Sequence, residues 1–255
     1  MPDAEYRALP YPSNSLLTKF KQSAAHVRQQ MLHGWAGTAA MKFGNVVHTL
    51  QLEPHLFDSR YGVTATIGVN FATKAGKAEK AAIIASGREC IKREQYNDAM
   101  SIIDAVKMHP SANYLFSEGR AEVAYAWEDE DTGQIVKGKA DFIRPDHIIV
   151  DLKKTQDASP RGFEKSIGAY SYHCQAAHYS NGCRVLTGIP HVFVFVCVEE
   201  AAPHAVGVYT LDSEAMMKGN AMISDYLRRY QECVDSGVWS GYSDRIEEIG
   251  VPPWA

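Results

Sequence analysis

The sequence predicts an α/β (α+β) fold in which helices flank a central mixed β-sheet. The first half of the chain carries helical periodicity, whereas strand-like alternation of apolar and polar residues begins near residue 120. A meander of three strands is followed by two helical segments, two further strands and a final helix. This order of elements is typical of a layered sheet covered by helices.

Length and composition indicate a single domain. The chain has 255 residues, 45% of them hydrophobic, which is enough for one sizeable core, and no linker divides it. We expect one domain over 1–255, with a helical portion at about 13–117 and the sheet at about 120–235. No apolar run is long enough to cross a membrane and the N-terminus lacks a signal pattern, so we expect a cytoplasmic protein. Five cysteines without a C-x-x-C pair are expected to be reduced thiols.

The early helices are predicted from capping residues and periodicity. The segment 13–20 begins with serine and asparagine and continues with leucines and a phenylalanine, which is typical of a capped helix start. A second helix is predicted over 39–52, and Pro54 restricts its continuation. The same reasoning predicts further helices before the sheet at 74–88, 94–108 and 113–116.

The sheet is predicted from alternation and turn signals. The segment 122–127 alternates, residues 131–133 (Asp-Thr-Gly) form a hairpin turn signal, and 135–143 is the returning strand. A third strand is expected at 147–152. The remaining elements are helices at 160–170 and 172–187, paired strands at 192–198 and 205–211, and a final helix from Asp212 to about Gly237.

Charged residues follow directly on the apolar run of the third strand. Ile148–Val150 has the composition of a buried strand and leads into Asp151-Leu152-Lys153. Asp151 and Lys153 share one face, about 6.6 Å apart, and Asp141 on the neighbouring strand adds a second carboxylate. Two hard oxygen donors for Mg²⁺ or Mn²⁺ beside a cation are the minimum for metal-assisted phosphodiester hydrolysis. An isolated pattern of this kind is more often a surface hairpin with a weak ion pair.

Four further polar residues are candidates for the same site. His48 lies among valines and leucines, where a histidine is more often a core residue than a ligand, yet a helix packed across the sheet would direct it to the aspartates. Gln175 and Tyr179 lie on one helix face, where they would hold a DNA phosphate or orient Lys153; a half-buried amphipathic face is the alternative. We expect Glu122 to support these residues or to serve the fold rather than to bind the metal.

The net charge of −4 argues against a protein that coats nucleic acid non-specifically, but a nuclease needs only a local basic surface. The candidates for that surface around the proposed site are Lys137, Lys139, Arg144, Lys153, Lys154, Arg161 and Lys165. Those expected to contact DNA are Lys42, Lys154, Arg161 and Lys165, of which Lys42, Arg161 and Lys165 are candidates for a 5′-phosphate pocket.

The order of these residues resembles the RecB-like nuclease family of the PD-(D/E)XK superfamily. His48, Asp141, Asp151-Leu-Lys153 and Gln175-x-x-x-Tyr179 follow one another as in that family. The likeness is closer to RecE-type exonucleases, the exonuclease VIII group, and extends from about Ser13 to the end of the chain. The segments that carry it are Gly44–Pro54, Trp127–Gly133, Tyr172–Ser180 and the terminal Pro-x-Trp254-Ala255. The chain departs from the family at Lys154, where threonine or serine is usual.

The resemblance implies a restriction-endonuclease-like core with an N-terminal helical part. It also implies a 5′→3′ exodeoxyribonuclease that digests one strand of linear double-stranded DNA and leaves 3′ single-stranded tails for recombination. The implied partners are DNA ends, further copies of the chain in a ring-shaped tetramer or trimer, and a RecT-type annealing protein in a bacterial host, with no membrane.

Our hypothesis for the reaction is hydrolysis with two Mg²⁺ ions, for which Mn²⁺ would substitute. Lys153 would orient the attacking water or help to deprotonate it. The expected metal ligands are His48, Asp141, Asp151 and the backbone carbonyl of Leu152, and the residues expected to steady the substrate strand are Gln175 and Tyr179.

Two alternatives remain open from the residues alone. A structure-specific or nicking DNA endonuclease would use the same chemistry with a different DNA path. A non-catalytic DNA-binding or assembly protein would have the same fold without turnover. The direction of digestion depends on the family likeness and not on the residues of the site.

Overall fold

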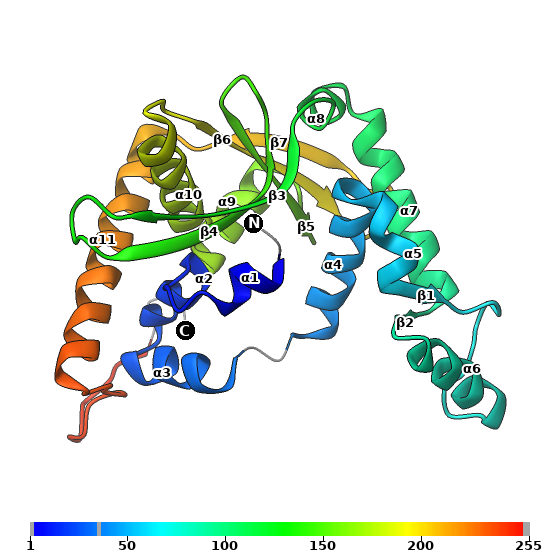
Figure 1. Cartoon of the computed structure of the whole chain (residues 1–255), viewed down its shortest axis with the longest axis horizontal. Coiled ribbons are helices and arrows are strands. Elements are labelled where there is room, and N and C mark those ends of the chain that lie inside the picture. The colour runs from blue at the N-terminus through cyan, green and yellow to red at the C-terminus, as the bar shows by residue number, and fades with distance from the viewer. Residues whose placement is uncertain (1–2, 35–36, 252–255) are drawn as a thin grey trace.

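A computed structural model describes residues 3–34 and 37–251 of the chain (Figure 1). The terminal Pro-x-Trp254-Ala255 pattern lies outside these residues. The helices, with the 3₁₀ turns labelled η, are α1 (Asp3–Ala8), α2 (Asn14–Leu17), η1 (Thr18–Lys21), α3 (Ala24–His33), α4 (Ala39–Leu52), η2 (Pro54–Leu56), α5 (Phe57–Arg60), α6 (Lys74–Ala85), α7 (Arg93–Met108), α8 (Pro110–Leu115), α9 (Pro160–Tyr170), α10 (Tyr172–Thr187) and α11 (Ser213–Ser236). The strands are β1 (Tyr61–Val63), β2 (Glu89–Ile91), β3 (Arg120–Glu128), β4 (Ile135–Ile143), β5 (Ile148–Thr155), β6 (Val192–Glu199) and β7 (Val206–Thr210).

The main sheet has five strands in the order β3-β4-β5-β6-β7. Strands β3, β4 and β5 form an antiparallel meander, β5 pairs with β6 in parallel, and β6 pairs with β7 antiparallel. A parallel pair requires a crossover connection, which α9 and α10 supply between β5 and β6. The predicted mixed sheet flanked by helices is therefore confirmed.

The sheet separates two hydrophobic cores. On one side it packs against α2, α3, α9, α10 and α11, and on the other against α4, α5, α7 and α8. Strand β6 serves both cores, because Phe193 and Phe195 belong to the first and Val194 and Val196 to the second. A strand buried on both faces reads as a continuous apolar run, which is why 192–198 is the most hydrophobic strand of the sequence.

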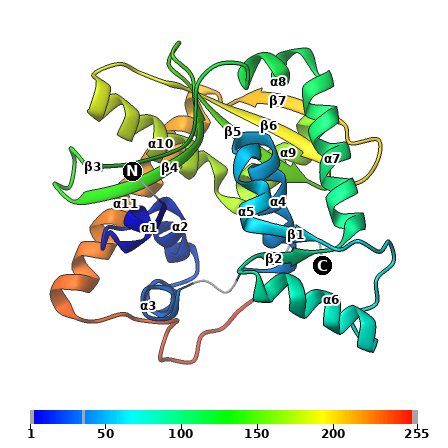
Figure 2. The ribbon, with the colours of Figure 1, turned by 45° about the vertical axis from the view of Figure 1, so that its right-hand side comes forward.

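A smaller unit, of which the sequence predicted the helix at 74–88 but not the two strands, branches from the helical part. Strands β1 and β2 pair in parallel, and α6 connects them. Figures 1 and 2 show α6 at the end of the helical part, away from the main sheet. Gly62 permits the close approach of α6 to β1, since a Cβ atom there would lie 2.4 Å from the Ile83 side chain. We call residues 61–93, from β1 to the first residue of α7, the arm.

The helices α1 and α3 were also missed by the sequence prediction, although Ser23 accepts a hydrogen bond from the backbone N–H of His26 in the manner of an N-cap. Among the described residues, no helix is both long enough and apolar enough to cross a membrane.

Candidate active site

Three carboxylates stand in one row across three adjacent strands. The β3–β4 register pairs Ala121 with Phe142 and Val123 with Ala140, which places Glu122 opposite Asp141. The β4–β5 pairing ends at Phe142 and Val150, and Asp141 and Asp151 are the next residue on each strand beyond the last pair. Residues directly opposite one another in a sheet are near neighbours. The topology therefore gathers acidic groups that are far apart in the sequence.

The sheet is distorted at this row. Glu122 has a φ of +51°, a left-handed conformation that is uncommon for a residue other than glycine. Ala140 packs in one core and Phe142 in the other, although residues two apart in a regular strand share a face. Backbone strain of this kind often accompanies functional sites, where surrounding structure holds it in place.

Asp141 bridges the gap between the two separating strands. Its Oδ2 accepts a hydrogen bond of 2.9 Å from the backbone N–H of Leu152. The carboxylate thus takes the place of a backbone acceptor, because the ladder between β4 and β5 has ended one residue earlier. This contact fixes the orientation of Asp141 beside the end of β5.

His48 approaches the same point from α4. Its Nε2–H donates to the carbonyl oxygen of Leu152 at 2.9 Å, and its Nδ1 lies 3.5 Å from Asp141 Oδ2. Val46 and Val47 are buried in the core beneath α4 and hold the helix against the sheet. The sequence prediction that a helix packed across the sheet directs His48 toward Asp141 matches this geometry.

Glu122 belongs to the donor cluster rather than standing behind it. One ligand atom each from His48, Glu122 and Asp141 lies within 4.8 Å of the other two. Glu122 also forms an ion pair with Lys139 of β4. This placement makes Glu122 a candidate metal ligand beside the supporting role expected from the sequence, and that expectation stays a prediction. The sequence contained a signal for this placement in the hairpin turn at 131–133. The turn fixes the register of β3 and β4, and residues at equal distances from it, such as 122 and 141, lie opposite one another.

Asp151 is engaged in a different set of contacts. It is 1% exposed; its Oδ2 lies 2.6 Å from Lys153 Nζ, and its Oδ1 accepts a hydrogen bond of 2.7 Å from Gln175 Nε2. The ring of Tyr172 covers Lys153, with Nζ 4.7 Å from the ring centroid. The expected side-by-side placement of residues 151 and 153 is present, and Gln175 holds the carboxylate rather than the lysine.

Burial and neighbouring charge set the protonation of these groups. Burial, with a further contribution from Asp151, raises the pKa of Asp141 to about 6, against an opposing effect of His48. Burial alone would lower the pKa of Lys153, but the adjacent Asp151 carboxylate raises it above its usual value. Lys153 is therefore a cation at neutral pH in the metal-free protein.

Tyr179 lies near Asp141 and Asp151, and its ring is packed among aromatic residues. Its ring packs near Gly138, where an added Cβ would approach ring atoms to 3.2 Å, and next to the rings of Tyr125 and Phe193. Burial raises the pKa of its phenol well above 10. These contacts show that Tyr179 packs α10 against β4, and its expected contact with a DNA phosphate stays a prediction.

Two of the cations predicted for the local basic surface, Lys137 and Lys154, make contacts within the protein instead. Lys137 is buried and donates to the carbonyl oxygens of Tyr6 and Leu9 at the end of α1. Lys154 pairs with Glu200, and its ammonium lies 5.4 Å from the ring centroid of Phe43. The candidates that remain exposed are Lys42, Arg161 and Lys165.

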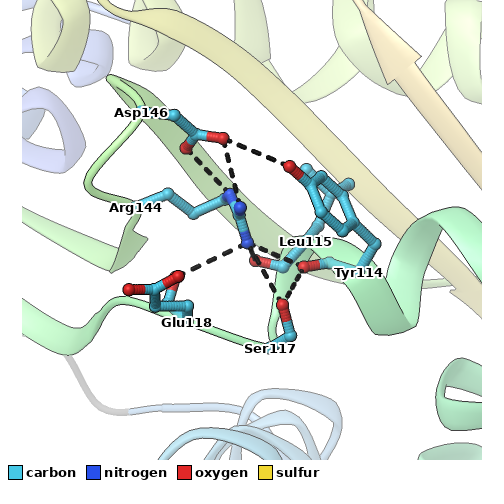
Figure 3. A network of polar contacts seen from close by, with 6 residues as sticks. All are labelled: Tyr114, Leu115, Ser117, Glu118, Arg144 and Asp146. Carbon is cyan, nitrogen blue, oxygen red and sulfur yellow. Dashed lines mark hydrogen bonds and ion pairs between the residues drawn. The ribbon is translucent and has the colours of Figure 1, made fainter.

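Arg144 is a structural residue and not part of a DNA-binding surface (Figure 3). Its side chain is 4% exposed, and its guanidinium pairs with Asp146 at 2.9 Å and donates to the carbonyl oxygens of Tyr114 and Leu115 at 2.7 and 3.3 Å. It also stacks on the Tyr114 ring, 4.3 Å from the centroid. These contacts tie the end of α8 to the turn between β4 and β5. The prediction that Arg144 contributes to a basic surface is wrong because a charged residue type does not reveal burial.

The donor set fits a hard divalent cation. Carboxylate oxygens from Asp141 and Glu122 converge with one imidazole of His48, beside the carbonyl of Leu152. Oxygen-rich sets suit Mg²⁺ and Mn²⁺, and no cysteine belongs to the cluster among the described residues. Divalent metals are general among PD-(D/E)XK nucleases, and these residues are able to hold one.

A meander followed by a helical crossover, with an aspartate on its second strand and Asp-x-Lys on its third, defines the PD-(D/E)XK class of nuclease folds. The chain belongs to the family described as "PDDEXK-like domain of unknown function (DUF3799)", whose model matches residues 13–250. This match supports the superfamily predicted from the sequence and does not single out the RecE type.

A search of solved structures agrees with the fold. The chain is similar to a crystal structure described as "Putative exonuclease" from Eubacterium rectale, with a TM-score of 0.71 and 15% identity over 99% of this chain and 96% of that one. At this identity the likeness shows the fold alone. A second structure, SSO0001, has 14% identity over 76% of this chain and 87% of that one, and its TM-score of 0.32 is too low to support an argument. No curated protein sequence matches the chain.

Proposed function

We propose that this protein is a metal-dependent exodeoxyribonuclease that hydrolyses phosphodiester bonds at the ends of linear double-stranded DNA. The observation that carries the proposal is the row of Glu122, Asp141 and Asp151, with His48 and Lys153 beside it. Carboxylates grouped at a buried position without a metal are electrostatically unfavourable, as the raised pKa of Asp141 shows. A binding function offers no reason for the fold to tolerate this cost.

The residues divide between metal binding and substrate handling. Asp141, Glu122 and His48, with the carbonyl of Leu152 and the carboxylate of Asp151, would hold Mg²⁺ or Mn²⁺. Such ions, when bound, neutralise charge on the phosphate and make water a better nucleophile at neutral pH. Two ions per site are part of the proposal.

Lys153 acts in this scheme as a fixed cation. Asp151 and the Tyr172 ring hold its ammonium group in place, so it is positioned to orient the attacking water and a non-bridging phosphate oxygen. Because Lys153 is protonated in the metal-free protein, orientation of the water suits it better than removal of a proton. The hydrogen bond from Gln175 restrains the Asp151 carboxylate and so preserves its ion pair with Lys153.

The direction of digestion and the partners are further parts of the proposal that depend on the sequence resemblance. They comprise 5′→3′ digestion that leaves 3′ tails, a ring-shaped tetramer or trimer, and a RecT-type annealing partner in recombination. The exposed Lys42, Arg161 and Lys165 remain candidates for a 5′-phosphate pocket.

One digestion experiment tests the central claim. Linear duplex and covalently closed circular duplex are incubated with the protein and Mg²⁺, and each strand of the linear substrate carries a distinct end label. We expect loss of the linear form alone. Labels at 5′ ends should be released before labels at 3′ ends, and EDTA should prevent digestion. Cut circles would instead favour the endonuclease, and digestion that persists in EDTA would contradict the metal mechanism.

The variant Lys153→Ala tests the role of the cation. Removing a preorganised electrostatic group commonly costs about 10²–10³-fold in rate, so we expect a loss of this size. Lys107→Ala, which removes an exposed lysine on α7, is the matched control and should digest at the wild-type rate. A Lys153→Ala protein that folds and digests at near wild-type rates would contradict the assignment.

A further inference from the structure

Positive charge is concentrated on the arm, residues 61–93. This segment contains six basic and two acidic residues, a formal charge of +4, whereas the whole chain carries −4 and the remainder therefore −8. The basic residues are Lys74, Lys77, Lys80, Arg88, Lys92 and Arg93. Such segregation is unusual in an acidic protein and makes the arm the natural contact for a polyanion.

Of the acidic side chains in and next to the arm, Glu79 and Glu94 serve its internal structure, and Glu89 is exposed on β2. Glu79 of α6 accepts a hydrogen bond of 2.6 Å from the backbone N–H of Ala65. Glu94, just beyond the arm, accepts one from the backbone N–H of Gly68. Both carboxylates are thus used to hold the loop that follows β1. The cations of α6 are left on the outside.

The lysines of α6 are presented to solvent. Lys74 and Lys77 are exposed, and no ion pair or hydrogen bond of either ammonium group is found within the described part of the chain. Lys80 is also exposed, and its ammonium lies 5.1 Å from the ring centroid of Phe71. Because three residues of helix rise about 4.5 Å, the three cations extend over about 9 Å along α6.

The surface between these lysines is built to approach a backbone closely. Ala78, Ala81 and Ala82 are exposed on α6 and carry only a methyl group. Short side chains let long lysines converge on a phosphate without obstruction by their neighbours. An exposed apolar stripe would suit a protein partner, whereas alanine interspersed with unpaired lysine suits a sugar–phosphate backbone.

We propose that the arm binds the phosphate backbone of duplex DNA through Lys74 and Lys77, with Lys80 beside them, away from the cluster of His48, Glu122 and Asp141. The inference depends on the proposed function, since it assumes that the substrate is double-stranded DNA. A duplex is a stiff rod with one negative charge per about 1.7 Å of axis, so it extends beyond a site that acts at its end. The arm would hold this distal part without reading its sequence.

Salt-dependent binding tests the proposal. The full-length protein is titrated in EDTA against a fluorescein-labelled duplex of about 30 base pairs, at KCl concentrations from about 50 to 300 mM. For Lys74→Ala/Lys77→Ala we expect the slope of log K against log [KCl] to become shallower by about 2, since each phosphate contact contributes about 0.9. We also expect weaker binding, by about tenfold or more, at 100 mM KCl.

The matched control is Lys218→Ala/Arg228→Ala, which removes two exposed cations from α11. This variant should keep the wild-type slope. An unchanged slope for Lys74→Ala/Lys77→Ala, while the wild-type protein binds duplex, would overturn the role of the arm and leave the nuclease proposal standing. If the wild-type protein binds no duplex at all, the arm proposal fails, and the digestion of linear duplex judges the proposed function separately. The same variants are also tested for binding to anionic phospholipid vesicles. If Lys74→Ala/Lys77→Ala loses vesicle binding but keeps wild-type duplex binding, the arm would be assigned to a lipid surface instead.

Discussion

Asp141→Asn should make the metal-free protein more stable at neutral pH while removing its response to metal. The side chain of Asp141 is 16% exposed, and burial together with Asp151 raises its pKa from 3.8 to about 6. The ionised carboxylate is thus disfavoured in the folded state. Asparagine resembles the neutral acid in shape and is still able to accept the hydrogen bond from the Leu152 N–H.

The sign and size follow from linkage. Between pH 4 and 6 the folded protein retains a proton on Asp141 that the unfolded chain has lost, so the free energy of unfolding falls as the pH rises through this window. The penalty is complete above about pH 6 and amounts to at most about 3 kcal/mol, at 1.36 kcal/mol per pKa unit. Asp141→Asn should recover up to this amount at pH 7.5 and almost none at pH 4.

Urea unfolding in EDTA at several pH values between 4 and 7.5 measures the difference directly. Added Mg²⁺ or Mn²⁺ should raise the wild-type free energy of unfolding and leave that of the variant nearly unchanged. A variant that is less stable than wild type at pH 7.5, or a difference that does not vary with pH, would refute the reasoning.

Asp151→Asn is the matched comparison and should have the opposite sign. Asp151 is 1% exposed and pairs with Lys153 at 2.6 Å, so the substitution leaves a buried ammonium without its partner. Loss of one partner from a buried pair typically costs about 3–5 kcal/mol. Two carboxylates in one row would then respond in opposite directions to the same substitution.

Two further predictions concern residues that position others. Gln175→Ala should lower the affinity for Mn²⁺ by about 10–100-fold, because Asp151 loses the amide that restrains it. Calorimetric titration measures this affinity, and an unchanged value would exclude the role of Gln175 in positioning Asp151. Arg144→Ala should lower the free energy of unfolding by about 2–4 kcal/mol in urea, because it removes the contacts that tie α8 to the β4–β5 turn; a loss below about 0.5 kcal/mol, as at ordinary surface sites, would contradict this role (Figure 3).

Local signals were sufficient to predict many of the elements. The bounds of α4, β4, α9 and α10 agree with the sequence prediction, because capping residues, turn signals and periodicity act within a few residues. The three-residue strands β1 and β2 were missed because such short segments carry no measurable periodicity.

The candidate site was predicted in part for the same reason. The same-face relation of Asp151 and Lys153 is a property of an extended strand, and the structure shows it as an ion pair. The place of Glu122 opposite Asp141 depends on strand register, which the hairpin turn contains but local composition does not. Burial of Lys137 and Arg144 is set by segments about 130 and 30 residues away, so residue type alone misassigned both to the surface.

The sequence by itself determined the layered α/β fold, the order of its acidic and basic residues, and the membership of residues 13–250 in a PDDEXK-like family. Only the tertiary structure decided which of those charges meet. It placed Glu122 with Asp141 and His48, gave Asp151 to Lys153 and Gln175, and left the lysines of α6 in solvent. The capping, turn and periodicity signals that predict helices and strands arise from interactions between near neighbours in the chain. The pairing and burial of charge arise from contacts between distant segments, which exist only once the chain has folded.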